Sequence, residues 1–270
     1  TPYRAQQDLP NFDSAPKDFN FDSLFTENAF SGIDRVSDSN QLTAGVVSRL
    51  LDPDSGAEAL RVGIAQRYLF REQRITPDNV PLTQHLSDLL VFGSTSLVPR
   101  WMFDTSVQYN PDLHRIERSL AGFRYSPGPY RTFGITYRLT RGLSEQVELG
   151  WQWPLYGPAA GDERSAHVSG KGCSGTLYGV GRVNYSTRDE RVTDAIAGLE
   201  YDAGCWIGRV VVERLSTGFS QATTRLLFQL ELVGLSRLGT NPLRVLKDNV
   251  PGYQLLREER NTTIPFTPYD

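Results

Sequence analysis

The sequence contains few of the residues that build metal centres, redox sites and transmembrane helices. It has two cysteines, Cys173 and Cys205, and three histidines, His85, His114 and His167, without the spacing of a zinc site. No run of about 18 apolar residues occurs, which excludes a membrane-spanning helix. The 28 basic residues do not outnumber the 31 acidic ones, so no basic excess is available for nucleic acid. We expect no metal, no cofactor and no nucleic-acid partner.

The sequence also lacks the settings in which catalytic side chains usually occur. No G-x-S-x-G motif is present, and the pair Gly179 and Gly181 lies inside a strand pattern, not in a phosphate-binding loop before a helix. A membrane phospholipase with Ser and His on a lipid-facing strand edge is the enzymatic alternative. The histidines fall in predicted loops or a turn instead, so we expect no enzyme.

What the sequence has in abundance is alternation of apolar and polar residues. Residues 147–153 (VELGWQW) show it clearly, because every second side chain is large and apolar. The pattern recurs after Gln41 in segments of roughly 9–11 residues or slightly more, long enough to cross a bilayer at a tilt. We predict about eleven strands, at residues 41–51, 59–71, 87–97, 101–110, 115–125, 131–140, 145–155, 175–187, 192–202, 205–215 and 221–235.

The two faces of these strands differ in polarity. A soluble sandwich hides its apolar face in a core, whereas a transmembrane barrel turns that face to lipid and encloses a polar lumen. The apolar face includes Phe133, Ile135, Val147, Leu149, Trp151, Trp153, Trp206, Val210, Val212, Phe228, Leu230 and Leu232. The polar face, which lines the lumen if the chain is a barrel, includes Arg138, Glu148, Gln152, Arg182, Asn184, Glu200, Arg209, Glu213, Arg225, Gln229 and Glu231.

The connections between the predicted strands favour the barrel. Tight turns at residues 52–56, 98–100, 127–129 and 202–204 share one side if the strands alternate up and down. The longer polar loop at residues 72–86 falls on the opposite side. Outer-membrane barrels show this asymmetry, with short periplasmic turns and longer outer loops. An antiparallel up-and-down transmembrane β-barrel is therefore the expected fold, although a sandwich shares the alternation.

The two ends of the chain are expected to lie outside the strands. Residues 1–40 are rich in Asp, Asn, Ser and Pro and have no sustained period, so we predict a loop or arm with at most short strands. Residues 41–235 hold the strands. Residues 236–270 form a C-terminal tail, expected at the periplasmic mouth or inside the lumen.

Several segments resemble a known family, and their order and spacing make the resemblance specific. The most distinctive are residues 198–206 (GLEYDAGCW), 228–235 (FQLELVGL), 241–243 (NPL) and 249–253 (NVPGY), with residues 3–8 (YRAQQD) and 32–41 (GIDRVSDSNQ) upstream. Together they resemble the lipopolysaccharide-assembly family LptD of the Gram-negative outer membrane, along essentially the whole chain.

The resemblance implies a barrel of about 26 strands, of which this chain would hold the C-terminal portion. The family's N-terminal domain, which receives lipopolysaccharide from the periplasmic bridge protein LptA, would lie outside it. Strands 41–51 and 221–235 would then have unpaired edges, which are costly in lipid.

The implied function is insertion of lipopolysaccharide into the outer leaflet. The saccharide would cross a hydrophilic lumen partly filled by the plug lipoprotein LptE, while the acyl chains leave through a lateral seam into outer-membrane lipid. The seam strand would be 221–235, where Phe228, Leu230 and Leu232 also resemble the signal read by the barrel-assembly machinery. Wet ion pairs in the lumen would each contribute little, roughly 0–1 kcal/mol. A general porin-like barrel and a soluble β-sandwich remain as alternatives.

The cysteines depart from the family pattern. The family often has two adjacent cysteines at the turn that matches Gly204 and Cys205, each bonded to the N-terminal region. Here Gly204 replaces the first, and Cys173 lies at the same predicted rim. Strand spacing puts Cys173 and Cys205 on the order of 10 Å apart, beyond the roughly 7 Å that a disulfide spans, although the loop at 156–174 could close the gap. An intrachain Cys173–Cys205 disulfide, bonds to the N-terminal region, and two unrelated thiols all remain open.

Overall fold

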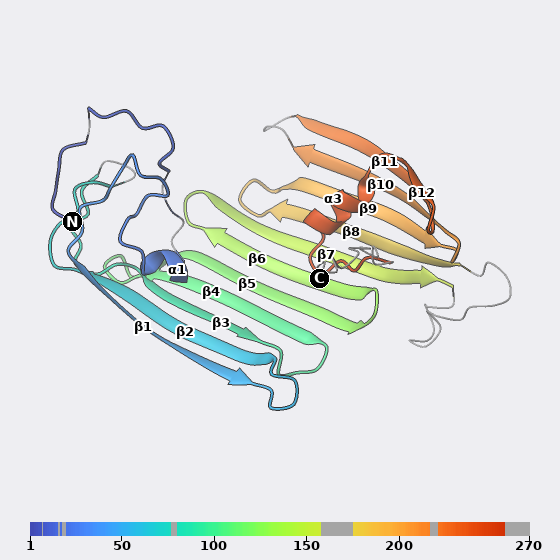
Figure 1. Ribbon diagram of the computed structural model, residues 1–270, viewed down its shortest axis with the longest axis horizontal. Coiled ribbons are helices and arrows are strands. Elements are labelled where there is room, and N and C mark those ends of the chain that lie inside the picture. Colours follow the sequence, from blue (N-terminus) through green and yellow to red (C-terminus); the bar gives the residue numbers. More distant parts are fainter. Residues whose placement is uncertain are drawn as a thin grey trace, which may run out of the picture. The chain divides into compact units, whose positions relative to one another are not determined.

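The computed structural model describes residues 1–256 except 7, 16, 18, 19, 77–79, 158–174 and 217–220. Twelve strands follow one another in chain order, each hydrogen-bonded to its neighbours in sequence (Figure 1). They are β1 (Gln41–Leu51), β2 (Glu58–Leu69), β3 (Leu89–Thr95), β4 (Trp101–Asn110), β5 (Arg115–Gly128), β6 (Arg131–Thr140), β7 (Ser144–Tyr156), β8 (Thr176–Ser186), β9 (Arg191–Asp202), β10 (Trp206–Ser216), β11 (Ala222–Leu232) and β12 (Ser236–Gly239). Within these described residues the helices are α1 (Phe21–Leu24) and α3 (Pro242–Asn249).

The predicted strands are confirmed within a few residues, with one difference at the end of the chain. The segment 221–235 is not one strand, because β11 ends at Leu232 and a twelfth strand, β12, follows. Gly234 has a φ of +82°, which glycine adopts without strain, and the Leu235 N–H donates to the Leu232 carbonyl at 3.0 Å. This turn folds β12 back along β11, so the expectation that the edge of the last long strand is unpaired was wrong for residues 229–232.

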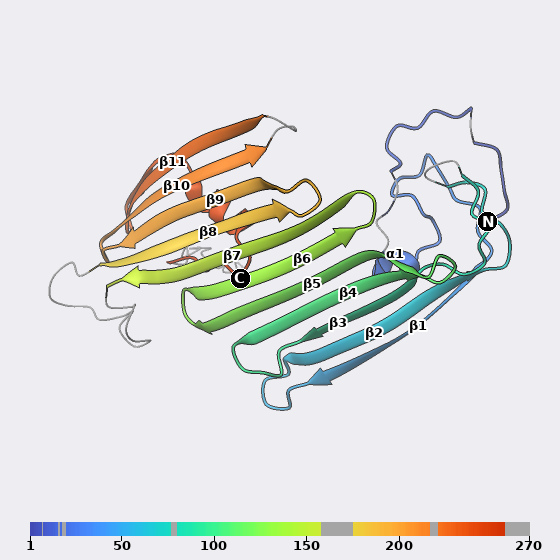
Figure 2. The ribbon, with the colours of Figure 1, turned by 180° about the vertical axis from the view of Figure 1, so that it is seen from behind.

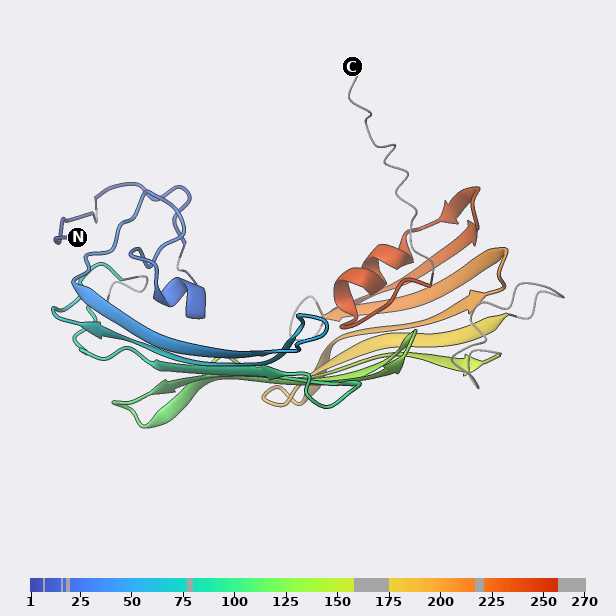
Figure 3. The ribbon, with the colours of Figure 1, turned by 60° about the horizontal axis from the view of Figure 1, so that its bottom comes forward.

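The chain divides into two compact units, and the first contains residues 1–124, 135–147 and 186–190. Strands β1 to β4 pair in antiparallel registers. The arm lies against one side of β1 and β2, as Figure 3 shows, and carries α1. Leu24 of α1 is buried, and the Phe21 ring meets that of Phe92 on β3 at 5.0 Å between centroids.

The second unit contains residues 125–134, 148–185 and 191–270. Strands β9 to β12 pair in antiparallel registers, with Arg209 of β10 opposite Glu200 of β9 and Gln229 of β11. Helix α3 lies behind β9 and β10 when the strands are viewed from the side shown in Figure 2. Its Leu246 packs with Val180, Ile196 and Val211 of three neighbouring strands.

Burial on the strands is the reverse of that in a soluble protein. On β9 and β10 the charged Glu200 and Arg209 are 0% and 2% exposed, whereas Val210 and Val212 are 46% and 42% exposed. On β1 and β2 the apolar Val46 and Ile64 are likewise exposed. A soluble sandwich would bury these valines, because burying apolar area is what drives folding in water. None of the described helices is long and apolar enough to cross a membrane.

Two helices lie in segments where the sequence predicted none. Helix α1 begins with a capping box, in which the Asn20 side chain accepts from the Ser23 N–H and the Ser23 hydroxyl accepts from the Asn20 N–H. Helix α3 is capped by Asn241, whose side chain accepts from the Arg244 N–H, and Pro242 occupies the first helical position. Both capping signals are short and occur in segments without periodicity. A search for alternating apolar and polar residues therefore did not reveal the two helices.

Candidate functional site

The residues predicted to line a lumen alternate on one face of their strands, called here the polar face. Glu148, Gln152, Glu200, Arg209 and Gln229 are buried on it. Asn184 and Glu213 are also buried, Arg182 and Glu231 are half-buried, and Arg138 and Arg225 are exposed. Most of them are shielded from solvent, which the sequence did not indicate.

A buried charge network forms the centre of the polar face in the second unit. The Arg209 guanidinium donates from Nε to Oε1 of Glu200 at 2.8 Å and from a terminal nitrogen to Oε2 of Glu231 at 2.6 Å. The same nitrogen donates to Oε1 of Gln229 at 3.3 Å. Arg237 of β12 contacts the second oxygen of Glu231 at 3.3 Å. These residues come from four consecutive strands, so the network joins the last strands side by side.

The pair of Arg209 and Glu200 is buried, unlike the wet ion pairs that the sequence led us to expect. Taking an ion out of water costs several kcal/mol, and the cost is recovered only when hydrogen bonds satisfy the charge. With Arg209 and Glu200 almost completely buried, removal of one partner leaves the other uncompensated. Removing one member of this pair would therefore cost the fold more than removing one member of a solvated pair at a surface.

A second charged group lies on β7 to β9. Arg182 of β8 pairs with Asp194 of β9 and lies 3.7 Å from Oε2 of Glu148 on β7. Asn184 donates to the other oxygen of Asp194 at 3.2 Å. Farther along, Glu213 and Arg225 are register partners on β10 and β11, which favours opposite charges. The structure thus brings together most of the predicted polar residues of this unit in two neighbouring clusters.

The C-terminal strap, residues 241–256, lies on the polar face and contacts the first of these clusters. The Tyr253 hydroxyl donates to Oε1 of Glu200 at 2.7 Å. The Gln152 side-chain amide donates to the Gln254 carbonyl at 2.9 Å and accepts from its N–H at 2.8 Å. Burial and the neighbouring Glu200 carboxylate raise the pKa of Tyr253, so its phenol remains protonated and can donate. The sequence expected a tail at the periplasmic mouth or in the lumen but did not identify these contacts.

On the first unit the polar face is covered by the arm. Arg67 of β2 donates to the backbone carbonyls of Ser23, Leu24 and Thr26 at the end of α1. A cation at this end compensates the free carbonyls and the negative end of the helix dipole. Arg67 was missed by the sequence analysis, because no local pattern announces a contact with a helix about forty residues earlier.

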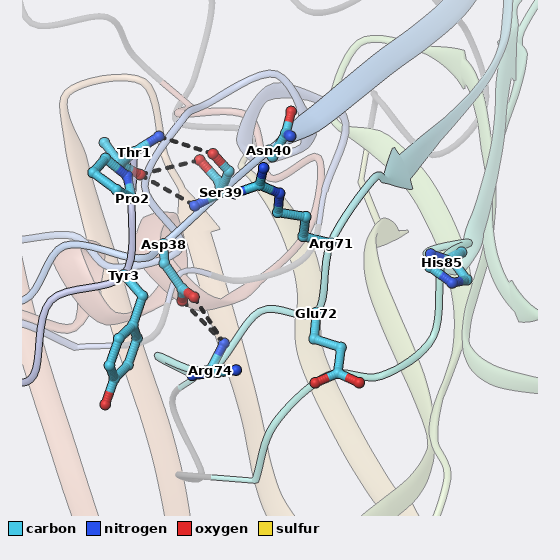
Figure 4. A pocket seen from close by; sticks show the side chains of 10 residues that line it. All are labelled: Thr1, Pro2, Tyr3, Asp38, Ser39, Asn40, Arg71, Glu72, Arg74 and His85. Carbon is cyan, nitrogen blue, oxygen red and sulfur yellow. Dashed lines mark hydrogen bonds between the residues drawn. The ribbon is translucent and has the colours of Figure 1, made fainter.

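Beside the arm lies a groove of about 770 Å³, shown in Figure 4. Asp38 accepts from the backbone N–H groups of Arg74 and Ile75, and the Arg74 guanidinium lies 5.4 Å from the Tyr3 ring centre. The lining residues are Thr1, Pro2, Tyr3, Asp38, Ser39, Asn40, Arg71, Glu72, Arg74 and His85. Its arginines are balanced by acidic residues, so the groove presents no excess of one charge to a ligand. In the described ranges no three His, Cys, Asp or Glu residues gather as a metal site.

The predicted seam residues lie on the apolar face of β11. Phe228 is exposed, and Leu230 and Leu232 are half-buried. On the edge of β11 that faces away from β10, the C-terminal half is occupied. Residues 229–232 pair with β12 there, and Thr240 exchanges hydrogen bonds with Phe228. The preceding part of the strand, residues 222–227, pairs with β10 on its other edge, but on this edge it meets no strand in the described parts of the chain.

The turn between β9 and β10 holds Cys205. Gly204 has a φ of +87°, and its N–H donates to the Asp202 side chain at 2.8 Å. Cys205 is exposed there, while Cys173 lies outside the described residues. The Cys173–Cys205 disulfide and the bonds to an N-terminal region therefore remain predictions.

An exposed apolar face opposite a polar face with sequestered charges defines the wall of an outer-membrane β-barrel. The comparisons agree with this class. The family described as LptD, LPS transport system D, matches residues 1–156. The LPS-assembly protein LptD of a Polaromonas species is 56% identical over 272 residues, covering 100% of this chain and 33% of that protein. Those of Albidiferax ferrireducens and Thiobacillus denitrificans are 50% and 41% identical, covering 100% and 94% of this chain and 34% and 32% of theirs.

The chain therefore belongs to the LptD family. It spans about a third of the length of the curated relatives that it matches. Members of this family are outer-membrane β-barrel proteins of Gram-negative bacteria, and the family description names a transport system, not an enzyme.

Proposed function

We propose that this chain forms the C-terminal part of the barrel of a translocon that inserts lipopolysaccharide into the outer leaflet. The observation that carries the proposal is the reversed burial on β9 and β10, where Glu200 and Arg209 are sequestered and Val210 is exposed. Such a wall separates a polar interior from lipid. An amphipathic substrate with a saccharide and acyl chains needs both environments at once.

The polar face would carry the saccharide. Sugar hydroxyls both donate and accept hydrogen bonds, so they are compatible with a wall of carboxylate, guanidinium and amide groups. The exposed members of the set, Arg138 and Arg225, are the ones that a passing saccharide or phosphate can reach. The fully buried members, such as Arg209, would instead hold the wall together.

The acyl chains would leave at the seam beside β11. Phe228, Leu230 and Leu232 present an apolar surface next to this edge, and residues 222–227 leave a section of the edge for a strand of the complete barrel. That partner strand would belong to the part of the protein outside this chain. Opening between the two strands would bring outer-membrane lipid into contact with the polar interior.

The partners follow from the same proposal. LptE would fill part of the lumen, LptA would deliver lipopolysaccharide to the N-terminal domain, and the barrel-assembly machinery would insert the barrel. Cys205, exposed at the turn between β9 and β10, is accessible for a bond to Cys173 or to the N-terminal region. Comparing the mass of non-reduced and reduced proteolytic fragments would distinguish these pairings.

Photo-crosslinking in cells that make the full-length protein tests the proposal. A photoreactive residue in place of Arg225, on the polar face, should capture lipopolysaccharide only while its synthesis continues. The same residue in place of Val212, on the apolar face, should capture resident membrane lipid whether or not synthesis continues. Absence of lipopolysaccharide capture at Arg225 would contradict the translocon and leave the porin-like barrel as the better account.

A further inference from the structure

The C-terminal strap makes specific contacts with the wall that a loosely attached tail would not make. Gln152 uses both polar ends of its amide to pair with the backbone of Gln254, as a neighbouring strand would. The Tyr130 N–H donates to the Gln254 side chain at 2.7 Å, and the Tyr130 hydroxyl donates to the Leu256 carbonyl at 3.2 Å. Backbone groups of the strap are thus satisfied by named groups of β7 and of the β5–β6 turn.

Apolar packing fixes the strap at both ends. Leu246 and Val250 are buried against Val180, Ile196 and Val211, which point to the polar face although they are apolar. At the far end, Leu256 packs with Tyr178 and Ile207, both buried. A lumen wall in contact with water would carry polar side chains at these positions. Apolar residues there indicate that this part of the wall is built to be covered.

The wall also leaves space for the strap. A Cβ atom on Gly150 would lie 3.0 Å from Cδ of Pro251, closer than nearly all such contacts. Gly150 therefore allows the strap to approach the backbone of β7. Together with the hydrogen bond from Tyr253 to Glu200, these contacts match the strap to the wall along β7 to β10 and to the β5–β6 turn.

We propose that the strap is a resident plug, which closes this stretch of the lumen to hydrophilic solutes while lipopolysaccharide passes elsewhere along the polar face. The proposal rests on the proposed function in one respect, namely that the polar face lines a lumen. In this proposal the strap, which is part of this chain, helps to seal a wide barrel. Release of the strap would expose the charge network and the apolar patch beneath α3 to water.

Cysteine accessibility in the full-length protein tests whether the strap is docked. Val250→Cys places a small thiol at a position that is 3% exposed. In isolated outer membranes a membrane-impermeant maleimide should label this thiol slowly. The labelling of the same protein with Val250 intact is subtracted as background. Adding Gln152→Leu or Tyr253→Phe should speed labelling roughly tenfold or more, because each removes hydrogen bonds that hold the strap. Tyr253→Phe removes only a hydroxyl, so it remains informative if Gln152→Leu fails to fold.

Entry of a large hydrophilic antibiotic into cells tests whether the docked strap is a seal. We expect Tyr253→Phe to increase entry while the amount of lipopolysaccharide at the surface stays unchanged. Tyr185→Phe is the matched control, since Tyr185 is 39% exposed on the apolar face of β8 and should change neither measurement.

Two results would overturn the plug. One is fast labelling of Val250→Cys in the otherwise unaltered protein. The other is faster labelling in Tyr253→Phe without increased antibiotic entry. Both leave surface lipopolysaccharide intact, so they are distinguishable from failure of the translocon itself, which appears as lost lipopolysaccharide capture at Arg225.

Discussion

Arg209 links the last strands of the chain through its side chain. Its guanidinium contacts side chains of β9 and β11, and through Glu231 it is linked to Arg237 of β12. Because Arg209 and Glu200 are almost completely buried, water cannot replace either partner when the other is removed. The effect of a substitution therefore depends on what it leaves behind in the wall.

Arg209→Met should destabilise the full-length barrel by about 3–5 kcal/mol, because it leaves the Glu200 carboxylate buried without a cation. Combining it with Glu200→Gln should recover much of this loss, since a neutral amide needs no counter-charge and can still accept from Tyr253. The measurement is the temperature at which the barrel loses its folded mobility in a gel. A double variant less stable than Arg209→Met would show that the pair is not the reason.

The sequence predicted the face on which Arg209 lies but not its surroundings. Alternation fixes side-chain direction on a strand, because successive residues point to opposite faces. Solvent exposure depends instead on what covers the face, and the covering residue, Tyr253, is 53 positions from Glu200. That contact arises from tertiary folding, and no local pattern encodes it.

At the scale of elements, the strap and β12 were the parts that the sequence described least well. Apolar residues continue through Val233 and Leu235, although out of step with the alternation of Phe228, Leu230 and Leu232, and residues 221–235 were predicted as one strand. The positive φ at Gly234 divides it. Similarly, Asn241 followed by a proline, with Leu243 and Leu246 three residues apart, is a recognisable helix start, but the helix is only 8 residues long and too short to show a sustained period.

Docking of the strap should persist in alkaline solution. Burial and the Glu200 carboxylate raise the pKa of Tyr253 above the ordinary value of about 10. A raised pKa means that the folded state favours the neutral phenol, so the stability from docking is complete below about pH 10 and is lost as the pH rises through the raised pKa. Tyrosinate absorbance of the full-length protein, titrated with and without Tyr253→Phe, checks this.

The two titrations should match near pH 10, because Tyr253 does not ionise with the ordinary tyrosines. Glu200 and Arg209 are the charged groups that contact or lie beside its hydroxyl, and both remain in the variant. If Tyr253→Phe removed one tyrosine that titrates near pH 10, the strap would not be docked in solution as it is in the structure.

At the scale of the whole molecule, the reversed burial makes a prediction that no soluble fold shares. Val210→Arg places a charge near the middle of β10 on the apolar face, and an arginine at the bilayer midplane costs about 2–4 kcal/mol. Thr224→Arg lies on the same face near the end of β11, where the cost falls to about 0–1 kcal/mol. Both side chains are exposed in the structure, so a soluble protein would tolerate both equally.

The measurement is the amount of folded full-length protein in the outer membrane. We expect Val210→Arg to reduce it strongly and Thr224→Arg to leave it nearly unchanged. Equal tolerance of the two substitutions would argue against a lipid-facing surface. At this scale the sequence was most informative, because alternation and family resemblance act over the entire chain, whereas turns and docking depend on a few residues each.

The short strand β12 also limits how the complete barrel can close. A strand beside β11 can form a continuous backbone ladder only with residues 222–227, because residues 229–232 already pair with β12. The ladder between β11 and that neighbouring strand is therefore shorter than β11 by nearly half. Fewer hydrogen bonds would have to break for these two strands to separate. If this boundary is the proposed seam, β12 therefore shortens the ladder that has to open.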